Sequence, residues 1–429
     1  MKITFVGHGY VGLVTAAIFA DLGNTVYVIG HTKEKIDNLN KGIIPIYEPG
    51  LSELVQRNVK AKRLLFTLNY SPYVQNSDVV FIAVGTPPKK SGEANLEMVF
   101  EVAEKIGKNL DGYTIVVTKS TVPIGTNRKV KEIVNKTKPK KAEFEVASIP
   151  EFLREGSAIS DTLHPDRIII GTESKKAEKL LVELHKPIGG HFILTNLETA
   201  EMIKYASNSF LATKISFSNS IAKLSELSGA DGIKVLEGMG LDKRIGKEFL
   251  QPGAGYGGSC FPKDVKALIS IASSYGYKFT LLEEVERINY EARLEIVKKT
   301  EKLLGNLKNK KICVLGLAFK SNTDDMRDAP SIDIINLLKE KGVSIKAYDP
   351  QAMANAKKII SGIDFGKDIY QTVDNADLLL ILTDWNEFKE IDLDRIKKLM
   401  KTPVIIDARN IHDPEKLRKM GFTYLGVGR

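Results

Sequence analysis

The beginning of the chain most constrains what it can fold into. An apolar run over residues 2–7 predicts a strand, a helical pattern follows over 11–22, and 25–29 predicts a second strand. Between the first strand and the helix the chain reads Gly7-His8-Gly9-Tyr10-Val11-Gly12. A G-x-G-x-x-G turn in this context makes room for a pyrophosphate, whose charge the helix N-terminus stabilises. The segment therefore predicts a βαβ unit that binds a dinucleotide at Gly7, Gly9, Tyr10, Val11 and Gly12.

Strand and helix patterns alternate in two separate parts of the chain. Further strands are expected at 79–84, 114–118, 144–148 and 167–171, and again at 312–316, 344–348, 378–383 and 403–407. Residues 196–238 and 263–304 between these parts are helical in pattern. Such alternation is typical of parallel sheets covered on both faces. We expect an α/β fold with two doubly wound, Rossmann-like domains (1–195 and 306–429) joined by a central helical domain (196–305) with a long spine helix.

Composition and charge exclude several classes of protein. The net charge of +9 comes from lysines and arginines spread along the chain beside acids, without a nucleic-acid-binding motif. No apolar run approaches the roughly 18 residues of a membrane helix. Two cysteines, Cys260 and Cys313, are too few for a disulfide framework or a multi-cysteine zinc site. We expect a cytoplasmic protein that binds no nucleic acid, membrane or metal.

The second expected strand ends without the acid that a dinucleotide site usually has there. An acidic residue at this place binds the adenosine ribose hydroxyls, but the chain reads Ile29-Gly30-His31-Thr32-Lys33. Two interpretations remain open. Either NAD binds through His31 or Thr32, or the small residue followed by Thr32, Lys33 and Lys35 accommodates the 2′-phosphate of NADP.

Cys260 is the most informative single residue. It follows a segment with four glycines in six residues, 253–258, which would let the backbone approach a ligand closely. Pro262 is tolerated only in the first turn of a helix, so Cys260 lies at or just before a helix N-terminus. There, with Lys263 adjacent, a nucleophilic thiolate is stabilised, and Asp264 faces the same side one turn later. Cys313, inside an apolar strand, is expected to be structural.

The pair Lys204 and Asn208, on the expected central helix, indicates a functional site only together with other motifs of the sequence. Lys204 and Asn208 are four residues apart, so they project from one helix face. Taken alone, a solvated helix face is the more common explanation.

Several short motifs occur together in a fixed order along the chain. They are Gly85-Thr86-Pro87, Lys119-Ser120-Thr121-Val122-Pro123, residues 150–156 (PEFLREG), Lys204 with Asn208, residues 257–264 (GGSCFPKD), and Ala318-Phe319-Lys320 with Asp324-Asp325-Met326-Arg327. Together they resemble the nucleotide-sugar 6-dehydrogenases, from residue 1 to about residue 410. The form Ser-Cys-Phe-Pro-Lys-Asp is more similar to the enzymes acting on UDP-glucose than to those acting on UDP-N-acetylmannosamine.

This resemblance implies oxidation of the C6 alcohol of UDP-glucose to UDP-glucuronate in two hydride transfers to NAD. Cys260 would form a thiohemiacetal and then a thioester, Lys204 and Asn208 would stabilise the oxyanion, Asp264 and Thr121 would manage protons, and Glu151 would assist hydrolysis. The implied cofactor residues further along the chain are Lys35, Thr86, Thr121, Glu155, Lys263 and Arg327. The implied substrate residues are Glu151, Phe152, Leu153, Arg154, Glu155, Lys204, Asn208, Arg244, Phe249, Leu250, Gln251, Pro252, Gly253, Gly257 and Lys320.

Other interpretations remain at this point. The sugar could be that of another UDP-sugar, such as UDP-N-acetylglucosamine or UDP-N-acetylmannosamine. A simple hydroxyacid-type dehydrogenase would have no use for Cys260, and a non-catalytic binding protein would have no use for the full set of Cys260, Lys204, Asn208 and Asp264. The central helix suggests a homodimer, and the resemblance implies that Arg244 reaches the substrate of the neighbouring subunit.

Overall fold

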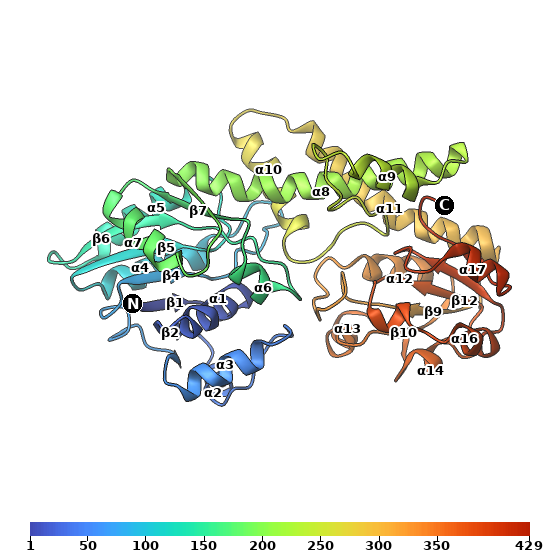
Figure 1. Cartoon of the computed structure of the whole chain (residues 1–429), viewed down its shortest axis with the longest axis horizontal. Coiled ribbons are helices and arrows are strands. Elements are labelled where there is room, and N and C mark those ends of the chain that lie inside the picture. Colours follow the sequence, from blue (N-terminus) through green and yellow to red (C-terminus); the bar gives the residue numbers. More distant parts are fainter. The chain divides into compact units, whose positions relative to one another are not determined.

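The computed structural model describes all 429 residues and divides into two compact units. The first unit contains residues 1–207 and 266–276, and the second contains 208–265 and 277–429. Each unit is built around one sheet (Figure 1). Among all the helices, none is both long and apolar enough to cross a membrane.

The sheet of the first unit has eight strands in the order β3-β2-β1-β4-β5-β6-β7-β8. They are β1 (Lys2–Val6), β2 (Thr25–Ile29), β3 (Leu64–Thr67), β4 (Val79–Ile82), β5 (Tyr113–Thr118), β6 (Glu143–Ser148), β7 (Arg167–Thr172) and β8 (His191–Thr195). The helices are α1 (Tyr10–Asp21), α2 (Lys33–Asn40), α3 (Leu51–Lys60), α4 (Glu97–Lys108), α5 (Thr126–Thr137), α6 (Ala158–Leu163) and α7 (Lys175–His185).

Alternate residues of these strands enter two separate hydrophobic cores. Phe81 of β4 packs in the core with α1, α3 and α7, whereas its neighbours Val80 and Ile82 pack in the core with α4 and α5. The expected sheet with both faces covered is therefore confirmed.

One strand pair departs from the expected parallel arrangement, because β7 runs antiparallel to β6. A parallel pair needs a crossover helix that returns along the sheet. The connection between these strands contains only the short helix α6, which packs against α1 instead.

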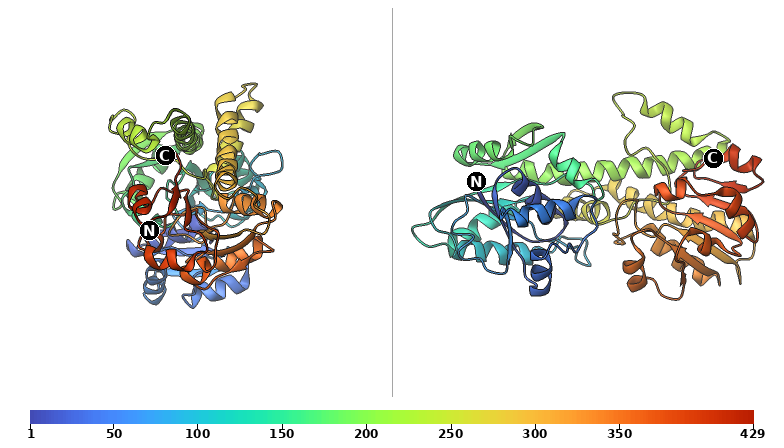
Figure 2. Two further views of the ribbon diagram at one scale, coloured as in Figure 1. Left: turned by 90° about the vertical axis from the view of Figure 1, so that its right-hand side faces the viewer. Right: turned by 60° about the horizontal axis from the view of Figure 1, so that its bottom comes forward.

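The helical segment consists of α8 (Leu197–Ser228), α9 (Gly232–Gly240), α10 (Phe261–Ser274) and α11 (Thr280–Leu304). Helices α8 and α11 are the two longest in the chain (Figure 2). The stretch 263–304 is not one helix, because Gly276 adopts a left-handed φ of 75° just after α10 ends.

The sheet of the second unit has six parallel strands in the order β11-β10-β9-β12-β13-β14. They are β9 (Lys311–Leu315), β10 (Ser344–Tyr348), β11 (Asp364–Phe365), β12 (Leu378–Ile381), β13 (Val404–Asp407) and β14 (Thr423–Leu425). The helices are α12 (Pro330–Glu340), α13 (Met353–Ile359), α14 (Ile369–Val373), α15 (Asn386–Lys389), α16 (Leu393–Leu399) and α17 (Pro414–Lys419).

The two sheets repeat one plan down to single hydrogen bonds. In the first, the backbone N–H of Lys2 donates to the carboxylate of Asp78 at 2.9 Å, and Asp78 returns a backbone bond to Lys2. In the second, Lys311 and Asp377 make the same exchange, with a side-chain bond of 2.9 Å. The similar segments Asn76-Ser77-Asp78 and Asn375-Ala376-Asp377 therefore mark equivalent positions in the two sheets.

Candidate active site

The glycine-rich turn after β1 has the geometry of a dinucleotide site. A Cβ on Gly7, whose φ is 120°, would lie 2.3 Å from the carbonyl oxygen of Ala83. A Cβ on Gly12 would lie 2.3 Å from the carbonyl oxygen of Gly7. Above Gly9, by contrast, there is nothing within 4 Å, and no side chain caps α1. The first and third glycines thus allow tight packing, and the second leaves open space where a pyrophosphate fits.

Two predicted cofactor residues meet at the carboxyl ends of β4 and β5. The hydroxyl of Thr86 donates to the carbonyl oxygen of Thr121 at 2.9 Å. Strands β1 and β4 are neighbours in the sheet although β2 and β3 lie between them in sequence. Ligands of doubly wound sheets bind at such a switch point.

Glu48 organises the first unit's site and was not found from the sequence. This buried carboxylate accepts hydrogen bonds from the hydroxyl of Tyr10 and from the backbone N–H groups of Gly156 (2.6 Å) and Ala158 (2.7 Å). It therefore joins the start of α1 to the segment that contains Glu155. A single acid in the loop Tyr47-Glu48-Pro49 carried no pattern that would have identified it.

Glu151, Lys204 and Lys119 form a buried charged cluster in the first unit. The Nζ of Lys204 lies 3.1 Å from Oε1 of Glu151, and these side chains are only 4% and 7% exposed. The other carboxylate oxygen of Glu151 accepts the N–H of Leu153 at 2.8 Å. Burial lowers the pKa of Lys119 to about 8; Glu151 opposes this shift and Lys204 adds to it. Lys119, which lies within a recognised motif, is a further site residue that sequence reasoning did not single out.

Three further predicted residues lie in the first unit. The Phe152 ring lies beneath the guanidinium of Arg167, 4.1 Å from its centroid. Arg154 forms an ion pair with Asp161 at 2.7 Å. Lys35 is exposed on α2.

In the second unit, Cys260 occupies the N-cap position of α10. Its carbonyl oxygen accepts the N–H of Asp264 at 2.8 Å, the first hydrogen bond of that helix. The thiol is half-buried, with the Ser259 hydroxyl 3.6 Å away. Cys313 is fully buried in β9, and burial raises the pKa of its thiol. The expected contrast between the two cysteines is present.

Asp264 lies where two other predicted residues converge. Its carboxylate is 1% exposed and accepts hydrogen bonds from the amide of Asn208 at 2.6 Å and from Lys263 at 2.5 Å. Lys204 and Asn208 are both buried, so a solvated helix face, the common explanation for such a pair, does not apply. A fixed amide can donate a hydrogen bond to an oxygen, and a buried carboxylate one helical turn after the capping thiol can accept a proton and return it.

Comparison with known proteins bears directly on this arrangement. The UDP-glucose/GDP-mannose dehydrogenase family matches with its NAD binding domain at residues 1–189, its central domain at 198–291 and its UDP binding domain at 313–414. The chain belongs to the UDP-glucose/GDP-mannose dehydrogenase family. NAD is accordingly the cofactor, which fits the open space above Gly9.

Individual relatives cover the whole chain. UDP-glucose 6-dehydrogenase TuaD of Bacillus subtilis is 50% identical over all of this chain and 93% of its own length. UDP-glucose 6-dehydrogenase of Rhizobium meliloti is 46% identical over the full length of both. The solved UDP-glucose dehydrogenase of Pyrobaculum islandicum is 37% identical, with a TM-score of 0.93 over 99% of this chain and 97% of that one.

The glycines before Cys260 allow this loop to pack closely within the fold of this family member. A Cβ would lie 2.7 Å from the Ala408 carbonyl oxygen at Gly253, and 2.3 Å from that of Asp328 at Gly257. Equally close contacts arise with Asn289 at Gly255 and with the Phe319 ring at Gly258. The loop before Cys260 therefore packs closely against its own chain, and the close approach of its backbone to a ligand stays a prediction.

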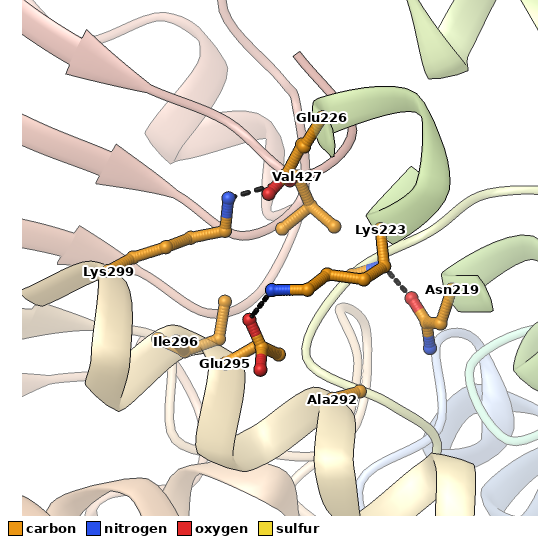
Figure 3. Close-up of a pocket in the computed structure, with 9 residues that line it drawn as sticks. Asn219, Lys223, Glu226, Ala292, Glu295, Ile296, Lys299 and Val427 are labelled. Carbon is orange, nitrogen blue, oxygen red and sulfur yellow. Dashed lines mark hydrogen bonds and ion pairs between the residues drawn. The ribbon is translucent and has the colours of Figure 1, made fainter. Parts of the chain in front are cut away.

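A backbone turn and a hydrogen bond hold the predicted substrate segment 249–253 in place. Phe249 adopts a left-handed φ of 64°, which bulky residues rarely do. The N–H of Gly253 donates to Oδ1 of Asn219 at 2.8 Å. Asn219 lines a small pocket beside two ion pairs, Lys223–Glu295 and Lys299–Glu226 (Figure 3). Asn219 was also missed from sequence, because its partner is distant along the chain.

The remaining predicted residues of the second unit lie in loops. Lys320 is partly buried after β9, Arg327 pairs with Asp325 at 2.7 Å, and Arg244 is exposed and pairs with Asp242 at 2.6 Å. The half-buried Arg409 donates to the carbonyl oxygens of Phe319 and Leu382, both at 2.8 Å. Arg409 holds the loop with Lys320 in place and was not predicted.

The family's UDP binding domain repeats the glycine turn but closes it with its own carboxylate. Gly316 occupies the place of Gly7, with a φ of 95°. Asp349, directly after β10, accepts the N–H groups of Leu317 at 2.8 Å and Ala318 at 3.1 Å. The backbone donors that could bind a dinucleotide are thus already used.

Proposed function

We propose that this chain oxidises UDP-glucose at C6 to UDP-glucuronate, using two molecules of NAD and Cys260 as a covalent nucleophile. Relatives at 43–50% identity are UDP-glucose 6-dehydrogenases by name, over the whole chain. The single observation that carries the chemistry is the position of Cys260 at the N-cap of α10, one turn before the buried Asp264 with its Asn208 partner. The helix N-terminus favours the thiolate there.

The reaction needs the protein to handle protons and negative charge while NAD, when bound, accepts hydride. In the first oxidation the sugar alcohol loses a hydride and a proton, which leaves an aldehyde. Lys204 and Asn208 supply preplaced donors to its oxygen. The proton released from the alcohol passes to Asp264 or to a water held with Thr121. The thiolate of Cys260 then adds to the aldehyde carbon, and the oxygen takes up that proton, giving a thiohemiacetal.

The thiohemiacetal still has a hydride to give. Its loss, together with the hydroxyl proton, leaves a thioester on Cys260. Glu151 assists a water molecule to attack the thioester carbon, the C–S bond breaks, and the carboxylate product leaves with the thiol regenerated. The buried Lys204–Glu151 pair lets that carboxylate act without losing its counter-charge.

The same proposal covers assembly and place of action. Phe210, Phe217 and Leu224 recur every seven residues on α8 and are exposed, which supports a homodimer with this helix at the interface. In this dimer Arg244 would reach the partner subunit's substrate.

Two free cysteines support action in the cytoplasm. The proposal also includes three domains, which are residues 1–195, 196–305 and 306–429.

The stoichiometry of NADH formation tests the mechanism. With limiting UDP-glucose, the protein and a Cys313→Ala control should form two NADH per sugar, and Cys260→Ser should not complete the second oxidation. One NADH per sugar in the unaltered protein, or two in Cys260→Ser, would contradict the covalent route. UDP-N-acetylglucosamine and UDP-N-acetylmannosamine in parallel assays distinguish the sugars.

A further inference from the structure

The adenosine end of the cofactor site has lost its usual acid for a structural reason. Gly30 directly follows β2, where a carboxylate would bind both ribose hydroxyls. A Cβ at this position would lie 2.5 Å from Cδ1 of Ile36 and 2.9 Å from Nδ1 of His8. An acidic side chain at this position would therefore have to displace the side chains of Ile36 and His8.

An imidazole takes the place of that acid. His8, between the first two glycines of the turn, is 6% exposed, and its Nδ1 is buried without a hydrogen-bond partner. Its ring lies 5.2 Å from that of His31. Burial lowers the pKa of His8, and His31 and Lys35 lower it further, which places both groups near the ring. The polar groups around Gly30 are thus nitrogen bases and cations.

The first turn of α2 adds further donors for an anion. Thr32 is the N-cap of this helix, and its hydroxyl makes no capping bond. Exposed Lys33 and Lys35 follow. The acids nearby are Glu34 on α2 and Glu101 on α4; Glu101 faces His31 and binds Lys105 at 2.5 Å. A helix N-terminus flanked by lysines is a site for a phosphate.

We propose that this chain binds NADP as well as NAD, with the 2′-phosphate held by Thr32, Lys33 and Lys35 beside His8 and His31. This inference rests on the proposed function, because it names a second cofactor for the same site. It does not alter the chemistry at Cys260, which lies in the second unit.

Calorimetric titration of the full chain with NAD and with NADP, without sugar, measures the effect directly. We expect NADP to bind at least as tightly as NAD. Adenosine 2′,5′-bisphosphate should bind at least about tenfold tighter than AMP, since charge-assisted hydrogen bonds to one phosphate are worth that much. NADP binding more than tenfold weaker than NAD, or equal binding of the two fragments, would overturn the proposal.

Variants assign the phosphate to these residues. Lys33→Gln combined with Lys35→Gln should lower the ratio of NADP to NAD affinity about tenfold or more. The control Lys41→Gln, at the other end of α2, should leave that ratio unchanged. Gly30→Asp combined with Ile36→Val, which removes the closest atom, should reverse the preference toward NAD. An unchanged ratio in the double lysine variant refutes the assignment even if the Gly30 variant does not fold.

These measurements separate the two proposals. Failure to oxidise UDP-glucose with NAD would contradict the proposed function without touching the binding ratio. Normal oxidation with NAD together with weak NADP binding would contradict only the cofactor inference.

Discussion

Replacing Lys204 by methionine tests whether the Glu151–Lys204 pair acts as a buried unit. The two charges are 3.1 Å apart, and Coulomb's law with an effective dielectric constant of about 20 gives ~5 kcal/mol for that distance. The change keeps an unbranched side chain of similar size but leaves the buried Glu151 carboxylate without its ion-pair partner. We expect the free energy of unfolding to fall by about 3–5 kcal/mol, as for other broken buried pairs.

A double-mutant cycle separates the pair from its surroundings. Glu151→Gln combined with Lys204→Met should cost at least about 2 kcal/mol less than the two single changes added together. Urea unfolding at pH 7 measures all four proteins. The control Lys108→Met breaks an exposed helix pair, 59% and 47% exposed, and should change stability by about 0.5 kcal/mol or less. Additive single losses, or a Lys204→Met cost near that of the control, would refute a buried coupled pair.

The pH dependence of this cluster has a defined sign. The pKa of Lys119 is about 8 in the folded protein and near 10.5 when unfolded, so the unfolded chain binds the extra proton between these values. Stability from this group should therefore rise with pH from about 8 to 10.5. Glu151→Gln removes the charge that supports protonated Lys119, so the rise should begin at a lower pH.

Three further expectations concern other parts of the chain. Iodoacetamide should label Cys260 and leave Cys313 unlabelled in the folded protein, as mass spectrometry of the digests will show, because only Cys313 is sealed in a strand. Burial lowers the pKa of His185 to about 4 from 6.5. The free energy of unfolding should therefore fall by about 3 kcal/mol as the pH falls from 6.5 to 4, because the unfolded chain takes up the proton first. Thermal unfolding curves of His185→Leu should not show this loss. Glu201 accepts the N–H groups of Gly125 at 2.6 Å and Asn127 at 2.8 Å, which cap α5; Glu201→Ala should cost about 2–4 kcal/mol in urea unfolding, and a loss below 1 kcal/mol would contradict this role.

Sequence patterns predicted those features of the fold and the site that depend on interactions within a few residues. The turn at Gly7 and the N-cap position of Cys260 follow from glycine spacing and from Pro262, which act within a few residues. The two aspartates before β4 and β12 likewise repeat a short pattern.

Features that depend on distant partners were not predictable in this way. Glu48 reaches Gly156 and Ala158, Asn219 reaches Gly253, and Arg409 reaches Phe319; each bond spans more than thirty residues. The antiparallel β7 depends on where a six-residue helix packs, which no periodicity reports. The close packing of the glycines before Cys260 was not predicted for the same reason, because the groups crowding them come from distant parts of the chain.

Asp349 gives the second sheet an anion of its own. Its carboxylate neutralises the turn after β9 permanently, whereas Gly30, at the equivalent place in the first sheet, brings no charge to the turn after β1. The turn after β9 therefore has a negative charge bound to it without any ligand, whereas the turn after β1 gains one only when the cofactor binds. Loss of the cofactor should therefore lower the stability of the N-terminal sheet and not that of the C-terminal sheet. In the cell, the stability of the N-terminal sheet thus depends on the supply of the cofactor.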